Sequence, residues 1–264
     1  VTLALPQDVQ AEAYDYPESF FEKRVWVVDR RPPSAEAVER AVGLLKGKKR
    51  PLIIAGGGVK YSEAEKELVA FAEALGIPVA ETQAGKSSIS WRHPLSVGGV
   101  GVTGTLAANR LARDADLIIG VGTRYSDFTT ASKWAFRNPD VSFLNINISA
   151  FDAAKLSGVS LVCDAKAGLN ALLEAAKRTG WRSGYADGEI AALKAEWDRE
   201  VDRLYGLESG QGLTQTRALG VINETIGPSA VIVNASGSLP GDLHRLWRCE
   251  QPNTYHMEYG FSCM

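Results

Sequence analysis

Cysteine is scarce in this chain of 264 residues, which has only Cys163, Cys249 and Cys263. An odd and unclustered set argues against a disulfide framework, so a reducing cytoplasm is the expected compartment. Long apolar runs are also lacking, since no stretch reaches the ~20 residues that a membrane-spanning helix needs. We therefore expect no membrane partner.

An excess of charge of one sign is missing as well. The chain has 29 Lys and Arg against 31 Asp and Glu, a formal net charge of -2, and no basic run. Nucleic acids and anionic membranes attract clusters of positive charge, so neither is an expected partner. With 45% hydrophobic and 23% charged residues, the composition is that of an ordinary globular protein.

Common catalytic and metal motifs are absent too. The sequence contains no GxSxG elbow, Walker loop or HExxH pair, so the usual hydrolase, nucleotidase and zinc-protease signatures do not apply. No zinc spacing joins the scattered candidates His244, Cys249, His256 and Cys263. We predict no metal ligand in the chain. Asp127 and Glu258 have no visible acid–base partner, and we assign neither a catalytic role.

The most informative stretch is 51–60, PLIIAGGGVK. It predicts a strand buried on both faces, then a turn through Gly56, Gly57 and Gly58 into a helix. The amides of such a turn can receive an anion or a nucleotide phosphate. Glycines also permit close packing of a helix on a sheet. Both interpretations stay open, and we favour packing.

Similar units recur along the chain. Strands are expected at 51–55, 77–81, 117–121, 141–148 and 160–163. Helices are expected after a Ser34 N-cap, after a capping box at 62–65, at 106–113 and at 165–178. This alternation predicts an α/β fold with a doubly wound, mostly parallel sheet over residues 34–178.

The flanking segments differ from this central domain. Residues 1–33 are expected to be a strand-like run at 1–5 and a linker wrapped on a surface. Residues 179–212 contain an amphipathic linker helix, and residues 213–264 begin a second α/β domain with a buried strand at 230–234. Because the chain begins with Val1 and stops at Met264 within an element, we expect a piece of a longer polypeptide.

A second glycine pattern, GVGVTG at 99–104, matches GxGxxG. It follows no clear strand, and no acidic residue ends the next strand to bind a ribose. A dinucleotide site needs that strand–turn–helix setting. We therefore predict a loop and helix entry here.

Several strings resemble thiamine-diphosphate-dependent enzymes of the acetolactate synthase type. They are VTLALPQDV at 1–9, the GGG turn, DADLIIGVGTR at 114–124 and LNINIS at 144–149. The resemblance covers nearly the whole chain. It implies the end of a pyrimidine-binding domain at 1–33, a central domain, and an incomplete diphosphate-binding domain at 213–264. Within the family, the strings 247–249 and 255–264 most resemble a branch of ring-opening hydrolases that acts on a cyclic dione of inositol catabolism.

The resemblance also implies a cofactor site. Ser236, Gly237 and Ser238 match the turn that lies against the diphosphate of thiamine diphosphate. The bent cofactor is supported by a segment that matches Ser262, Cys263 and Met264. The family's activating glutamate would precede Val1 and its Mg²⁺ ligands would follow Met264, so the chain alone is expected to be inactive.

Further expectations come from the same resemblance. The substrate is expected to be a small cyclic dione, and the intact protein a homodimer or homotetramer. FAD or ADP is an unlikely ligand, because the sequence offers no adenine or ribose reader. Two alternatives stay open: an acetolactate-synthase-like carboligase or decarboxylase, and a non-catalytic nucleotide-binding or assembly module.

Overall fold

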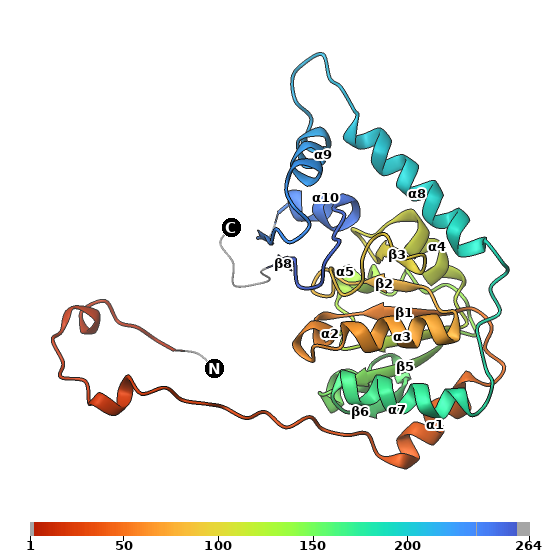
Figure 1. The fold of residues 1–264 in the computed structure, drawn as a ribbon, viewed down its shortest axis with the longest axis horizontal. Coiled ribbons are helices and arrows are strands. Elements are labelled where there is room, and N and C mark those ends of the chain that lie inside the picture. The colour runs from red at the N-terminus through yellow and green to blue at the C-terminus, as the bar shows by residue number, and fades with distance from the viewer. Residues whose placement is uncertain (1–2, 236, 258–264) are drawn as a thin grey trace.

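The computed structural model describes residues 3–235 and 237–257 of the chain. Its centre is a parallel sheet of six strands in the order β3-β2-β1-β4-β5-β6 (Figure 1). The strands are β1 Pro51–Ala55, β2 Val79–Glu81, β3 Ser96–Gly99, β4 Leu117–Val121, β5 Ser142–Asn147 and β6 Val159–Val162. The predicted α/β class with a parallel sheet is confirmed.

Helices cover both faces of this sheet. Alternate strand residues point to opposite faces, so Ile53 and Ile119 join one apolar core while Ile54 and Ile118 join another. The first core packs against α1 Ala35–Leu45, α3 Glu65–Leu75 and α7 Ala165–Lys177. The second packs against α4 Leu106–Asp114 and α8 Glu189–Tyr205. The sheet is therefore doubly wound, as predicted.

Further helices complete the described chain. They are α2 Gly57–Tyr61, α5 Asp127–Thr130, α6 Ala150–Ala153, α9 Gln215–Thr225 and α10 Leu239–Leu246, with 3₁₀ turns at Val9–Ala11, Glu18–Phe20 and Lys155–Ser157. Within the described ranges, no helix combines the length and the apolar character needed to span a bilayer.

The capping box predicted at 62–65 is wrong. Helix α3 begins at Glu65 after Ala64, which makes no side-chain cap. The Ser62 hydroxyl instead donates to Asp164 Oδ2 at 2.7 Å and accepts from Lys166 N at 3.0 Å. A tertiary partner at the start of α7 thus replaces the local partner. By contrast, Ser34 caps α1 as predicted, accepting from Ala37 N at 3.2 Å.

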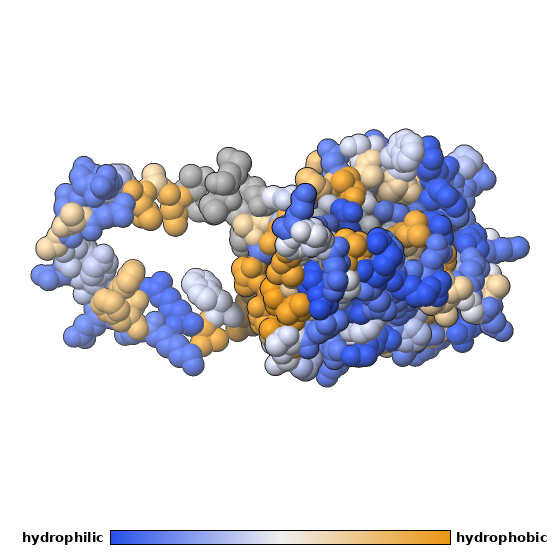
Figure 2. Space-filling model, turned by 90° about the horizontal axis from the view of Figure 1, so that it is seen from above, coloured by the Kyte–Doolittle hydropathy of each residue, from blue (hydrophilic) through white to orange (hydrophobic). Residues whose placement is uncertain are grey.

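The N-terminal segment also differs from prediction. Residues 3–5 form no strand, and the segment up to residue 29 extends away from the body instead of wrapping on it (Figures 1 and 2). Its apolar side chains Val25 and Trp26 are 75% and 82% exposed. Contact with the body begins at Arg30, which is paired with Asp164 at 3.1 Å.

A small second unit follows α8 and α9. Strand β7, Ile232–Asn234, pairs in parallel with β8, Tyr255–Met257, and α10 connects them. The strand predicted at 230–234 exists, but it is not buried: Val233 is 71% exposed. A strand is buried on both faces only when layers cover both, and in the described chain this sheet has two strands.

Candidate cofactor-binding turn

The Gly56–Gly58 turn is closed by its neighbours. Gly56 N donates to Val121 O at 2.8 Å, and Gly58 N donates to Gly122 O at 3.0 Å. A Cβ on Gly58 would lie 2.6 Å from Gly122 Cα, and one on Gly56 would lie 2.6 Å from Thr123 Cα. Two amides that an anion would need are thus already bonded to carbonyls. This geometry supports the packing interpretation over the nucleotide interpretation.

The GxGxxG loop has a different setting from the one predicted. Strand β3 was missed because Ser-Val-Gly-Gly is short and has no apolar run, yet it leads directly into the loop, which then enters α4. The loop is nevertheless occupied by protein. A Cβ on Gly99 would lie 2.6 Å from His244 Nε2, and Gly101 N donates to Asn109 Oδ1 at 2.9 Å. Gly99 therefore makes room for α10, whereas a Cβ on Gly101 would meet Phe128 and Thr129 of α5.

The turn between β7 and α10 is open. Gly237 has φ of 136°, and among residues 3–235 and 237–257 nothing lies within 4 Å of a Cβ built on it. Ser238 is exposed, and its side chain makes no cap bond to α10. The turn follows the carboxyl end of a parallel strand and leads into a helix N-terminus, the usual position for an anionic ligand. Gly237 and Ser238 thus fit a diphosphate.

The remaining predicted cofactor residues lie outside the described chain. They are Ser236, between the described ranges, and Ser262, Cys263 and Met264, which follow β8. Strand β8 ends at Met257, which is paired with Asn234 at the end of β7. In sequence, the string 236–238 comes directly after β7 and the string 262–264 comes after the described end of β8.

Polar side chains join this unit to the central domain. Gln83 Nε2 donates to Pro240 O, in the first turn of α10, at 3.0 Å. Tyr255 Oη of β8 donates to Gln83 Oε1 at 3.1 Å. His244 of α10 lies within hydrogen-bonding distance of Thr103 Oγ1, at 2.8 Å. These contacts come from the segments after β2 and β3, at the carboxyl edge of the central sheet.

Ionisable groups are buried beside this junction. Glu81 is 3% exposed, and its Oε1 accepts from Ser88 N at 2.8 Å and Ile89 N at 3.2 Å. Burial raises the pKa of Glu81, an effect that nearby Lys86 opposes. Burial also lowers the pKa of Lys60, whose ammonium donates to Tyr255 O at 2.5 Å. Both groups therefore lie at the joint between the central domain and the small unit.

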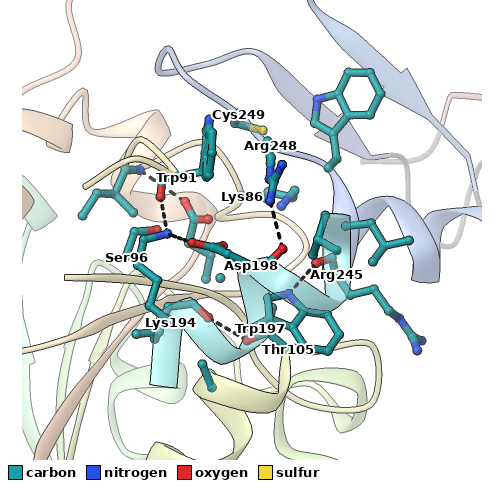
Figure 3. Close-up of a pocket in the computed structure, with 18 residues that line it drawn as sticks. Lys86, Trp91, Ser96, Thr105, Lys194, Trp197, Asp198, Arg245, Arg248 and Cys249 are labelled. Atoms are coloured by element: carbon teal, nitrogen blue, oxygen red, sulfur yellow. Dashed lines mark hydrogen bonds and ion pairs between the residues drawn. The ribbon is translucent and has the colours of Figure 1, made fainter. Parts of the chain in front are cut away.

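Figure 3 shows a cavity between β2, β3, α8 and the end of α10. Lys194 Nζ donates there to Trp91 O at 2.7 Å and is paired with Asp198 at 3.1 Å. The guanidinium of Arg248 lies 4.4 Å from the ring centroid of Trp91. With a volume of about 40 Å³, the cavity has room for a few waters. It is too small for a cyclic dione, so it is not a substrate site.

The cysteines and the metal candidates show no site chemistry in the described chain. Burial raises the pKa of Cys163 to about 12 and that of Cys249 to about 11, so neither thiol is ionised near neutrality. Across residues 3–235 and 237–257, no three side chains of His, Cys, Asp or Glu are grouped to hold a metal ion. Cys263 and Glu258 lie outside these ranges.

Residues 38–172 match the family model described as the central domain of thiamine pyrophosphate enzymes. The chain belongs to the thiamine pyrophosphate enzyme family. The resemblance inferred from the sequence is thereby confirmed. The matched range contains the six-stranded sheet and the larger part of α1 and of α7.

Curated relatives match the whole chain. It is 52% identical to a 3D-(3,5/4)-trihydroxycyclohexane-1,2-dione hydrolase of Clostridium tetani and 53% identical to a protein of the same name from Geobacillus thermodenitrificans. A third, from Bacillus thuringiensis, is 48% identical. Each alignment covers 100% of this chain but only 44–45% of the relative. The chain thus spans less than half the length of these relatives.

Sequence reasoning missed the junction residues Gln83, Thr103, His244 and Tyr255. They lie up to 172 positions apart, and no local spacing connects them. One signal was present: the polar run ETQAGKSS at 81–88 directly follows a buried strand. Side chains at that edge of a parallel sheet commonly contact a ligand or a second domain.

Proposed function

We propose that this chain is the middle of a thiamine-diphosphate-dependent hydrolase that opens the ring of 3D-(3,5/4)-trihydroxycyclohexane-1,2-dione. The observation that carries the proposal is the identity of 48–53%, over the whole chain, to relatives of that name. Membership of the thiamine pyrophosphate enzyme family agrees with it.

In this proposal the open turn holds the cofactor. Gly237 and Ser238, with Ser236, bind the diphosphate through backbone amides and small hydroxyls at the N-terminus of α10. Ser262, Cys263 and Met264 support the organic part of the cofactor, Met264 being apolar and adaptable. When bound, thiamine diphosphate supplies a carbon nucleophile for a substrate ketone. This chain's residues bind and orient it.

The other parts of the site are proposed to come from outside this chain. They are a glutamate that would activate the cofactor and the residues that would hold a Mg²⁺ ion. Accordingly we assign no catalytic residue and no metal ligand to residues 1–264, and we expect the chain alone to be inactive. The complete enzyme is proposed to be a cytoplasmic homodimer or homotetramer.

The experiment that tests the function compares two substrates on the complete enzyme. We expect turnover of the cyclic dione that requires both thiamine diphosphate and Mg²⁺, and no turnover by the 264-residue chain. Turnover of pyruvate without turnover of the dione would favour the carboligase or decarboxylase alternative and would contradict the hydrolase.

The nucleotide-binding alternative has its own test. Titration of the 264-residue chain with FAD and with ADP should show no micromolar binding, because the Gly56 and Gly58 amides are already bonded within the protein. Micromolar affinity for either nucleotide would support a non-catalytic binding module.

A further inference from the structure

The helix that follows the open turn is held by the central domain. A Cβ on Gly99 of the GxGxxG loop would lie 2.6 Å from Nε2 of the His244 ring, so only glycine lets that ring lie on the strand end. On the same helix, a Cβ built on Gly241 lies 3.2 Å from Thr103 Cγ2. Helix α10 therefore packs closely against the loop at 99–104.

The hydrogen bonds between α10 and the central domain have a defined direction. The carbonyl of Glu81 can only accept, so His244 Nε2, at 3.1 Å, carries the proton. Nδ1 then accepts from the Thr103 hydroxyl at 2.8 Å. That hydroxyl in turn accepts from Gln83 Nε2 at 3.4 Å. Each N–H or O–H bond of this network points to one acceptor, which fixes the orientation of all three side chains.

The hydrogen bonds of Gln83 also reach the two elements of the small unit, α10 and β8. Gln83 also donates to Pro240 O, three residues after Gly237, and accepts from Tyr255 Oη on β8. His244 is 1% exposed and Gln83 is 6% exposed. Buried polar networks whose members are all paired specify one arrangement of the elements they join.

We propose that Gln83, Thr103 and His244 are positioning residues for thiamine diphosphate. They fix α10 and β8 on the central domain, and with them the Gly237–Ser238 turn. The inference rests on the proposed function for the identity of the ligand. None of the three residues need contact the cofactor, so their removal should weaken cofactor affinity and leave the rate at saturation nearly unchanged.

The first test uses the 264-residue chain without cofactor. Thr103→Val removes one hydroxyl and keeps the shape of the side chain. We expect the backbone amides of α10 to exchange hydrogen about fivefold faster, since one network bond is lost. The control is Tyr185→Phe, which removes a bond of 2.9 Å to Pro51 O at the other end of the sheet. It should leave α10 unchanged.

The second test measures binding of thiamine diphosphate, with Mg²⁺, to the complete enzyme by titration calorimetry. We expect Thr103→Val to raise Kd about fivefold and His244→Phe to raise it further. His244→Gln, which keeps a donor for the Glu81 carbonyl, should recover part of the loss. The kcat at saturating cofactor should change less than twofold in Thr103→Val.

The outcomes separate the two proposals. A wild-type complete enzyme that does not bind thiamine diphosphate overturns the proposed function and this inference with it. If wild type binds the cofactor, and Thr103→Val and His244→Phe have the same Kd as Tyr185→Phe, the inference alone is overturned. Unchanged exchange of α10 in Thr103→Val would also overturn it.

Discussion

Two strand–glycine–helix units in this molecule have opposite surroundings. At the turn from β1 to α2, Gly56 and Gly58 press against Gly122, and their amides donate to neighbouring carbonyls. At the turn from β7 to α10, no atom of the described part of the chain lies within 4 Å of a Cβ on Gly237. The first turn needs glycine for lack of space, whereas the second needs it for its positive φ.

The difference shows that a glycine turn at a strand end does not by itself indicate a ligand site. The loop between β4 and α5, which lies 66 residues further along the chain, closes the first turn. What leaves the second turn open is a small sheet whose described part has two strands. In this protein the unit with the clearer sequence pattern is the packed one, and the weaker pattern marks the candidate site.

The largest expected effect compares the cores of the two units. Ile119→Ala in β4 removes a fully buried side chain and should lower the free energy of unfolding by about 4 kcal/mol. Val233→Ala in β7, where the side chain is 71% exposed, should change it by less than about 0.5 kcal/mol. Urea denaturation of the chain measures both. Equal losses would mean that the small sheet is buried in solution.

The next largest effect compares a Gly→Ala substitution in each of the two turns. Gly56 has an extended backbone, so Gly56→Ala costs stability only through its clash with Gly122 and Thr123, by about 3 kcal/mol. Gly237→Ala meets no described residue within 4 Å, so its cost of about 1 kcal/mol comes from the φ of 136°. The same urea titration distinguishes them. If Gly56→Ala lowered the free energy of unfolding by less than Gly237→Ala, the first turn would not be the more tightly packed of the two.

The junction should respond to pH. Burial lowers the pKa of His244 to about 3, with the charges of Lys86 and Arg245 adding to the effect. Because the unfolded state binds this proton near pH 6.5, stability should fall as the pH drops from 6.5 toward 3, by up to about 1.4 kcal/mol per pH unit.

His244→Gln provides the comparison, because glutamine does not titrate. The raised pKa of Glu81 acts in the opposite direction, but wild type and variant share it, so the difference between their stability–pH curves reports His244. Curves with the same slope between pH 6.5 and 4 would show that the ring is protonated in the folded protein.

The smallest effect compares two serines that precede helices. Ser34 caps α1 through Ala37 N, and Ser34→Ala should lower the free energy of unfolding by about 1 kcal/mol. Ser238 makes no such bond to α10. Without cofactor, Ser238→Ala should therefore leave the thermal midpoint unchanged. A loss equal to that at Ser34 would show that Ser238 has a structural role of its own.

The fold was predictable wherever the apolar pattern of the local sequence matches the burial of its residues in the structure. Strand β4, Leu117–Val121, is a continuous apolar run between a helix and a glycine, and its bounds were predicted without error. The failures involve partners distant in sequence. Ser62 has the spacing of a capping box but bonds to Asp164, which is 102 residues away. Strand β3 has too few apolar residues to be recognised, and its neighbour β2 defines it.

The candidate site was predictable only through family resemblance. Gly237 and Ser238 were identified from their match to a cofactor turn, and the structure adds that the turn is open. From the sequence we predicted that His244 is a scattered structural residue. No pattern near it in sequence indicates its contacts. Its role depends on Gly99 and Thr103, which are more than 140 positions away.

The most direct test of the account measures thiamine diphosphate binding by the complete enzyme with one substitution in each glycine turn. Gly237→Ala should raise the Kd at least tenfold, because the open turn would lose the backbone shape that receives the diphosphate. Gly57→Ala, whose Cβ would lie 3.2 Å from Ala84 Cβ, should leave the Kd within twofold of wild type. Loss of binding in Gly57→Ala with normal binding in Gly237→Ala would contradict the account.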